Sequence, residues 1–171
     1  MKKLETERFI LRYINKSDIN DIFNNYASDD EVTKYLTWPT HKSINDTMKV
    51  FDIWQKEDDN IKKYHYFIEY KLNHQIIGSV AVNSFIDGNP ELGYVLGRNY
   101  WGLGIMSEAC KLLIKVLQDD GYNKILINAE KDNIASLKVI DKCGFKFVKE
   151  DIVDVPLKNK KVMCKFFELI K

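Results

Sequence analysis

Apolar residues recur at helical spacing in two early segments of the chain. Residues 8–14 alternate enough to predict a strand, and Ser17 then offers a side-chain oxygen as the N-cap of a first helix. The apolar face of that helix would hold four residues: Ile19, Ile22, Phe23 and Tyr26. A second helix is predicted to begin at Ser43, because Asp46 stands three residues later in a capping-box position. Its buried stripe would comprise Ile44, Met48 and Phe51.

Between residues 64 and 97 the pattern changes from helical spacing to runs of β-forming residues. Three such runs predict strands over 64–70, 75–85 and 91–97. The polar segments that separate them, 72–74 and 87–90, are typical of hairpin turns. The middle of the chain is therefore predicted to form two consecutive hairpins.

Helices and strands alternate in the rest of the chain. A helix is predicted over 106–120, ending at Gly121, with one apolar side made of Ile105, Ala109, Leu112, Leu113 and Val116. A short helix over 134–142 would stop at Gly144, which suits a left-handed cap. Further strands are predicted over 124–130, 145–155 and 161–170. The pattern predicts a mixed sheet with one strand–helix–strand crossover, of the α/β or α+β class, in a single domain over 1–171.

Composition narrows the classes of function. The 171 residues can bury a core without disulfides, and the net charge of +1 provides no basic surface for nucleic acid. The three cysteines (Cys110, Cys143 and Cys164) form no CxxC pair and the histidines are scattered, so no metal site is predicted. Neither a signal peptide nor a membrane span is recognisable, so we expect a cytoplasmic protein with no membrane partner.

A glycine-containing turn leads into the longest predicted helix. Residues 98–105, RNYWGLGI, join the strand at 91–97 to that helix. Glycine lets the backbone approach a ligand closely, and the first N–H groups of a helix are unpaired and partly positive. The turn is therefore predicted to cradle a phosphate or pyrophosphate.

Two common phosphate-binding motifs do not fit this turn. A kinase-type P-loop requires a lysine and a hydroxyl residue after the last glycine, whereas Ile105 and Met106 follow Gly104. A dinucleotide motif requires a third glycine, whose place is taken by Ser107, and it belongs in the first strand–helix unit of a larger repeated array.

Four blocks of the sequence, in the expected order, resemble the GNAT acetyltransferase superfamily. Residues 90–109 resemble its acyl-CoA-binding motif, and residues 133–145, with N-x-x-S followed by G-F, resemble a second block. The opening residues 4–12 and the segment 35–39, YLTWP, are similar to the branch that contains the Rim-type ribosomal-protein N-terminal acetyltransferases.

This resemblance implies a three-layer fold and acetyl-CoA as the acyl donor. The central sheet would be mostly antiparallel, with about seven strands and about four flanking helices, and splayed at the cofactor strand. The pantetheine arm of the donor would pair with the exposed backbone edge of Val95 and Leu96. The full set of cofactor contacts implied by the resemblance is Val95, Leu96, Gly97, Arg98, Trp101, Gly102, Leu103, Gly104, Ile105, Met106, Ser107, Asn133 and Ser136.

Direct transfer of acetyl to an amine requires a proton acceptor and a group that assists the leaving thiolate. Glu91 opens the cofactor strand and is the candidate base, although a solvated strand-end carboxylate is equally compatible with its position. Many relatives use a tyrosine as the acid, seven residues after the asparagine, but Ile140 occupies that position here. Ser136 is the remaining candidate acid, with cofactor contact or helix capping as its alternative roles.

The resemblance implies a primary amine as the acceptor, in particular the N-terminal α-amine of a protein such as a ribosomal protein. Residues expected near the acceptor are Tyr35, Trp38, His41 and Phe85, with core packing as the alternative for Trp38. A small amine is the alternative acceptor, and an acidic pocket of Glu91, Glu69 and Asp87 would favour a polyamine. A non-catalytic acyl-CoA sensor is also compatible. The sequence leaves open whether the protein is a monomer or a homodimer.

Overall fold

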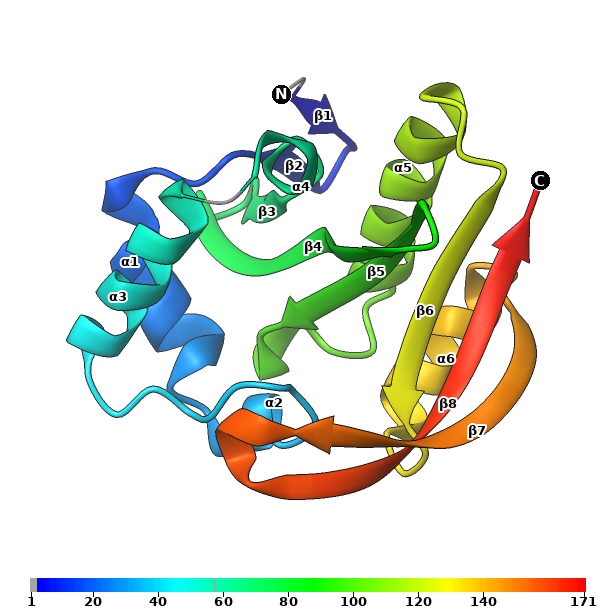
Figure 1. Ribbon diagram of the computed structural model, residues 1–171. Coiled ribbons are helices and arrows are strands. Elements are labelled where there is room, and N and C mark those ends of the chain that lie inside the picture. The colour runs from blue at the N-terminus through cyan, green and yellow to red at the C-terminus, as the bar shows by residue number, and fades with distance from the viewer. Residues whose placement is uncertain (1–2, 57) are drawn as a thin grey trace.

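The computed structural model describes residues 3–56 and 58–171, which fold around one eight-stranded sheet with helices on both faces (Figure 1). The strands are β1 (Leu4–Glu5), β2 (Phe9–Arg12), β3 (Tyr66–Tyr70), β4 (Gln75–Ile86), β5 (Asn89–Leu96), β6 (Lys124–Glu130), β7 (Lys146–Val155) and β8 (Lys160–Ile170). The helices are α1 (Ile19–Ile22), α2 (Asp30–Thr33), α3 (Ile44–Gln55), α4 (Asp59–Lys62), α5 (Ile105–Asp119) and α6 (Ile134–Lys142). The predicted mixed α/β fold is confirmed.

The sheet opens between its two central strands. The strand order is β1-β2-β3-β4-β5-β6-β8-β7, and every neighbouring pair is antiparallel except β5 and β6. These two parallel strands pair only at Glu91 with Leu126 and at Leu92 with Ile127. Beyond Leu92 they diverge, which gives the predicted splay at the strand that precedes the glycine turn.

The N-terminal helices differ from the prediction at their start. A 3-10 turn over Lys16–Asp18 leads into α1, and Asn15, not Ser17, is the N-cap of that turn, because Asn15 and Asp18 form a capping box. The helix then widens into a π-helical turn over Phe23–Ala27, where the Ser28 N–H donates to the Phe23 carbonyl at 3.1 Å. Apolar spacing alone does not reveal such a turn.

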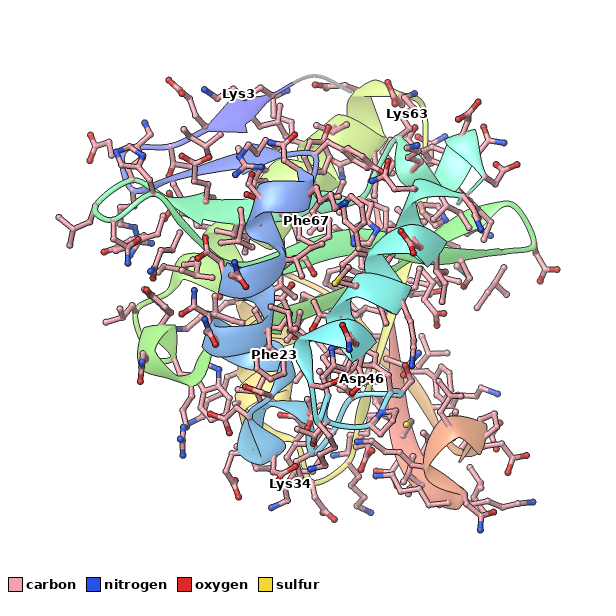
Figure 2. All side chains as sticks on the ribbon, turned by 90° about the vertical axis from the view of Figure 1, so that its left-hand side faces the viewer. Lys3, Phe23, Lys34, Asp46, Lys63 and Phe67 are labelled. Carbon is pink, nitrogen blue, oxygen red and sulfur yellow. The ribbon has the colours of Figure 1, made fainter. Side chains whose placement is uncertain are left out.

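Helix α3 begins as predicted, with a capping box between Ser43 and Asp46. Its buried side differs from the prediction, because Met48 is 39% exposed and Thr47 is fully buried instead. Thr47 is fixed there by the His41 ring, whose Nδ1 lies 2.8 Å from its hydroxyl oxygen. Seen from their own side, α1 and α3 lie side by side across one face of the sheet (Figure 2).

Helices α5 and α6 cover the opposite face and enclose the larger core. Of the predicted stripe on α5, Ile105, Ala109 and Leu113 are buried, while Leu112 and Val116 are partly buried against the same core. The buried surface of α5 is wider than one stripe, and includes Cys110, Ile114 and Leu117. The predicted cap at Gly144 is confirmed by its φ of 86°.

Other differences lie at the ends of elements and in short elements. The two-residue strand β1 and the single-turn helices α2 and α4 bring the counts above the predicted seven strands and four helices. The turn between β4 and β5 consists of Asp87 and Gly88, both at positive φ, so Asn89 and Pro90 already belong to β5. Each short element has too few residues to produce a periodic pattern.

Candidate active site

Two cavities lie on opposite sides of the splay and share six residues. The first, about 580 Å³, is lined by the β4–β5 hairpin, the loop after α2, and strands β6, β7 and β8. The second, about 600 Å³, is lined by the end of β5, the glycine turn, and the first turns of α5 and α6. We call the first the acceptor cavity and the second the donor groove. The residues that line both are Tyr35, Leu36, Tyr94, Val95, Asn133 and Ser136.

The start of α5 forms the floor of the donor groove. Gly102 and Gly104 have φ of 77° and 75°, and a Cβ at either position would meet no atom within 4 Å. Over residues 3–56 and 58–171, no side chain caps α5, whereas Asp29 caps α2 and Asn133 caps α6. The amides of this first turn therefore face open space and suit an anionic group such as a diphosphate.

Most of the predicted cofactor residues line this groove, namely Val95, Leu96, Trp101, Gly102, Gly104, Ile105, Met106, Ser107, Asn133 and Ser136. Three do not. Arg98 turns away to pair with Asp29 at 3.0 Å. Leu103 is half exposed, and its carbonyl accepts from Arg8. Gly97 is required for packing, because a Cβ there would lie 2.6 Å from the Asn25 carbonyl oxygen.

The unpaired edge of β5 differs in one respect from the prediction. The Gly97 N–H donates to the Ile77 carbonyl on β4 at 2.8 Å. Because backbone groups alternate in direction along a strand, Val95 also directs its N–H and C=O toward β4, and Tyr94 and Leu96 direct theirs toward the splay. The Trp101 indole N–H donates to the Leu96 carbonyl at 2.7 Å and braces the loop. Val95 therefore lines both cavities, but its backbone N–H and C=O face β4 and are not available to pair with a pantetheine arm.

Glu91 lies in the acceptor cavity, at the point where β5 still pairs with β6. One carboxylate oxygen accepts from the Asn128 amide at 2.8 Å and the other from the Ser84 hydroxyl at 3.0 Å. Both partners are neutral, so these hydrogen bonds orient the carboxylate without cancelling its charge. Asn128 lies on the neighbouring strand and could not be paired with Glu91 from the sequence.

A tyrosine that the sequence reasoning did not consider contacts Ser136. The Tyr94 hydroxyl oxygen lies 2.7 Å from the Ser136 hydroxyl oxygen and 3.2 Å from the Ser136 carbonyl. Asn133 caps α6 by accepting the Ser136 N–H at 3.1 Å, so Ser136 is not itself the cap. Burial raises the pKa of Tyr94 well above its usual range. The alternating pattern of β5 was the available signal, since it places Tyr94 on the face toward α6.

Of the four residues expected near the acceptor, Tyr35 and Trp38 line the acceptor cavity. His41 lines neither cavity: it is buried, packs on Trp38 with ring centroids 5.2 Å apart, and its pKa is lowered by burial. Phe85 also lies outside both cavities and packs against Tyr122. His41 and Phe85 therefore have packing roles, and their positions outside the cavities do not agree with the expected contact with the acceptor.

The two cavities differ in charge. Among the described residues, the acceptor cavity is lined by Glu91 and Glu130 and by no lysine or arginine. Glu130 is paired with Lys160 at 2.9 Å, which leaves Glu91 as the carboxylate held only by neutral groups. The donor groove is lined by three lysines, Lys34, Lys138 and Lys142, against two acidic residues. One side therefore suits a cation and the other an anion.

Two predicted acidic residues are absent from the acceptor cavity. Glu69 is bound to Arg12 at 2.5 Å, and Asp87 lies at the exposed hairpin turn.

Tyr26, from the π-helical turn, also lines the acceptor cavity. Its buried hydroxyl has no hydrogen-bond partner among the described residues, a cost of about 1–3 kcal/mol unless water or a ligand supplies one.

The hairpin of β7 and β8 forms one wall of the acceptor cavity and is tied to α2. At its tip, the Lys158 ammonium donates to the carbonyls of Thr33 and Lys34 at 2.5 and 3.2 Å. The tie joins residues more than a hundred positions apart and attaches the hairpin just before the loop that carries Tyr35 and Trp38. In Figure 1 the hairpin, in orange and red, passes below α2.

Over residues 3–56 and 58–171, no cluster of three or more His, Cys, Asp or Glu could hold a metal ion. In the same part of the chain, no helix has the length and apolar character needed to cross a bilayer. The three cysteines are free thiols.

Comparison with known proteins identifies relatives along nearly the whole chain. A family model described as "Acetyltransferase (GNAT) domain" matches residues 8–146. The "uncharacterized N-acetyltransferase p20" of Bacillus licheniformis is 32% identical over 153 residues, which are 85% of this chain and 83% of the relative.

Two solved structures share the fold. The microcin C7 self-immunity acetyltransferase MccE, in complex with acetyl-CoA and AMP, has a TM-score of 0.84 at 22% identity, over 97% of this chain and 94% of its own. RimL, a ribosomal L7/L12 α-N-protein acetyltransferase in complex with coenzyme A, has a TM-score of 0.80 at 17% identity, over 99% and 98%.

Proposed function

Because the chain belongs to the GNAT acetyltransferase family, we propose that it transfers acetyl from acetyl-CoA to a primary amine. The observation that carries this proposal is the pair of oppositely charged cavities that meet at the splay between β5 and β6. An anionic donor and a cationic acceptor can approach from opposite sides and meet at the shared residues, which include Tyr94 and Ser136.

The donor groove fits coenzyme A. The free amides at the start of α5, together with the empty space above Gly102 and Gly104, would hold its diphosphate. The backbone of Tyr94, on the open edge of β5, would pair with its pantetheine arm. Once bound, the donor supplies the activated acetyl group.

Glu91 is proposed as the base. An ammonium group in the acceptor cavity would meet one carboxylate, Glu91, that has no cationic partner among the residues the structure describes. An α-amine has a pKa near 8, so about a tenth is neutral at pH 7, and a carboxylate acting directly or through one water is sufficient help. Ser136 is proposed to assist the departure of the thiolate, since the position of the tyrosine used by many relatives is taken by Ile140.

We further propose the N-terminal α-amine of a protein as the acceptor. RimL, which shares the fold, is an α-N-protein acetyltransferase, and this likeness supports the choice. The charges support it as well: one uncompensated carboxylate matches one ammonium, whereas a polyamine would bring several charges against the aromatic wall of Trp38 and Trp54. A ribosomal protein is the acceptor class suggested by that likeness.

Thiol release from acetyl-CoA tests the proposal. The protein is incubated with peptides that have free N-termini, with the same peptides acetylated at the N-terminus, and with polyamines. We expect release that depends on the free N-terminus. Release only with small amines would overturn the proposed acceptor, and donor binding without any amine-dependent release would overturn the proposed transfer.

A further inference from the structure

Tyr94 and Ser136 form a pair of hydroxyl groups at the junction of the two cavities. Tyr94 comes from β5 and Ser136 from the first turn of α6, and both residues line the acceptor cavity and the donor groove. Their oxygens are 2.7 Å apart, a distance typical of a good hydrogen bond between hydroxyls. The pair therefore lies where the two ligands of a transfer reaction would meet.

The direction of this hydrogen bond decides whether the Ser136 proton is available to a ligand. The Tyr94 proton can go to the Ser136 hydroxyl oxygen at 2.7 Å or to the Ser136 carbonyl at 3.2 Å. When Tyr94 donates to the hydroxyl oxygen at the shorter distance, the Ser136 O–H is not engaged with Tyr94. It can then donate its hydrogen bond to another group. The Ser136 N–H is already held by Asn133, so the first turn of α6 is fixed.

Burial determines the role that Tyr94 can take. Its pKa is raised by burial well above the usual range, and the hydrogen bond with Ser136 only partly offsets this. A phenol that holds its proton this tightly is a poor acid for a thiolate, whose conjugate thiol has a pKa near 8.5. The same property makes it a dependable hydrogen-bond donor over the whole neutral range.

We propose that Tyr94 is a positioning residue that orients the Ser136 hydroxyl toward the sulfur of the acyl donor. The inference rests on the proposed acetyl transfer. The amine nitrogen forms a bond to the acetyl carbon, the carbon–sulfur bond breaks, and its electron pair stays on sulfur. Glu91 receives the amine proton. Ser136 donates a hydrogen bond to the thiolate, which takes its proton from water after release.

The ionisation of bound coenzyme A measures this role without turnover. The ultraviolet absorption of the thiolate, followed against pH with coenzyme A bound at saturation, gives the pKa of the bound thiol. A hydrogen bond to a charged sulfur should lower that pKa relative to free coenzyme A. We expect Tyr94→Phe and Ser136→Ala each to raise it by about one unit, because charged hydrogen bonds contribute roughly that much.

Turnover provides the second readout. Tyr94→Phe should lower kcat about 10-fold and leave KM for acetyl-CoA within about two-fold, since the bond matters most when charge develops on sulfur. Ser136→Thr keeps a hydroxyl and should retain most of the activity. The double variant Tyr94→Phe with Ser136→Ala should lose no more than Ser136→Ala alone. Tyr122→Phe, outside both cavities, is the control.

An unchanged thiol pKa in Tyr94→Phe would overturn the inference, and so would losses that multiply in the double variant. A purely structural hydroxyl would change stability without moving the thiol pKa. If the wild-type protein binds coenzyme A with a lowered thiol pKa but shows no amine-dependent release, the proposed transfer fails and the positioning role of Tyr94 stands.

Discussion

Glu91 differs from the other carboxylates of the site in the groups that hold it. Asn128 and Ser84 fix its two oxygens and carry no charge, whereas Glu130 is neutralised by Lys160. A carboxylate oriented in this way can attract an ammonium group and accept its proton without first breaking an ion pair. The residues that orient it come from β4 and β6, the two neighbours of its own strand.

The substitution Glu91→Gln keeps the shape and removes the base. We expect kcat/KM for the amine to fall about 100-fold at pH 7, where most of an α-amine is protonated, and by clearly less at pH 9, where it is mostly neutral. The pH–rate profile measures this directly. Glu168→Gln, which removes a carboxylate paired with Lys124 outside both cavities, should leave the profile unchanged. Equal losses at both pH values would exclude Glu91 as the base.

At the scale of elements, the partly buried Arg12 joins strands β2 and β3 to the start of α1. The Arg12 guanidinium donates to both oxygens of Asp18, at 2.7 and 2.9 Å, and to Glu69 at 2.5 Å. Burial raises the pKa of Glu69, but the bonds from Arg12 and His74 outweigh it, so the net pKa is lowered. The lowered pKa means that the ionised form of Glu69 stabilises the folded state.

Arg12→Met would leave two partly or fully buried carboxylates without their cation. We expect a loss of about 3 kcal/mol in the free energy of unfolding at pH 7. Because the folded pKa of Glu69 lies below its unfolded value near 4.3, its contribution is complete above that value and is lost as the pH falls through the folded pKa.

The difference between Arg12→Met and wild type, measured by urea unfolding, should therefore be nearly constant down to about pH 4.5 and shrink as the pH falls further, to about 2.5. Lys42→Met breaks an exposed pair with Asp30 and should leave the free energy of unfolding unchanged within error at either pH, because solvent screens such a pair. A constant difference for Arg12→Met across this range would show that packing of its alkyl chain, and not the ion network, sets the loss.

Elements with strong local patterns were predictable from the sequence, and others were not. The range predicted for β6 and that predicted for α6 match the structure residue for residue, because alternation and helical spacing there continue to a clear end. Met48 was wrongly assigned to a buried stripe, since the side of α3 that is buried depends on His41 and the sheet. The π-helical turn depends on its contacts with Ile76 and Gly97, far along the chain.

The same distinction holds for the site. The turn at Gly102 and Gly104 is a local feature, so its shape followed from the residue types. The pairing of Tyr94 with Ser136 joins residues 42 positions apart, so the alternation of β5 indicates the face on which Tyr94 lies but not its partner. The expectation that Phe85 lies near the acceptor was wrong for the same reason. The strand that carries Phe85 was predicted, but the packing of its ring against Tyr122 was not.

At the scale of the whole molecule, the open sheet separates two regions of opposite charge. Helices α5 and α6, which lie together on one side of the sheet (Figure 1), supply the free amides and two of the three lysines of the donor groove, and the hairpin of β7 and β8 forms a wall of the acidic, aromatic cavity. The Lys158 tie to α2 holds that hairpin in place. Transfer of the acetyl group then requires only that the reacting atoms of donor and acceptor meet at the splay. The residues next to those atoms would be the six that line both cavities.

Calorimetric titration with acetyl-CoA tests the donor groove most directly. Gly104→Val forces a branched side chain onto a positive φ at the start of α5, and should weaken binding at least about 100-fold. Gly88→Val is the matched control, because its φ of 78° and its open surroundings are the same but it lies at the β4–β5 turn. Its affinity should equal that of the wild type. Equal affinity of Gly104→Val and wild type would contradict a diphosphate held by the amides of this turn.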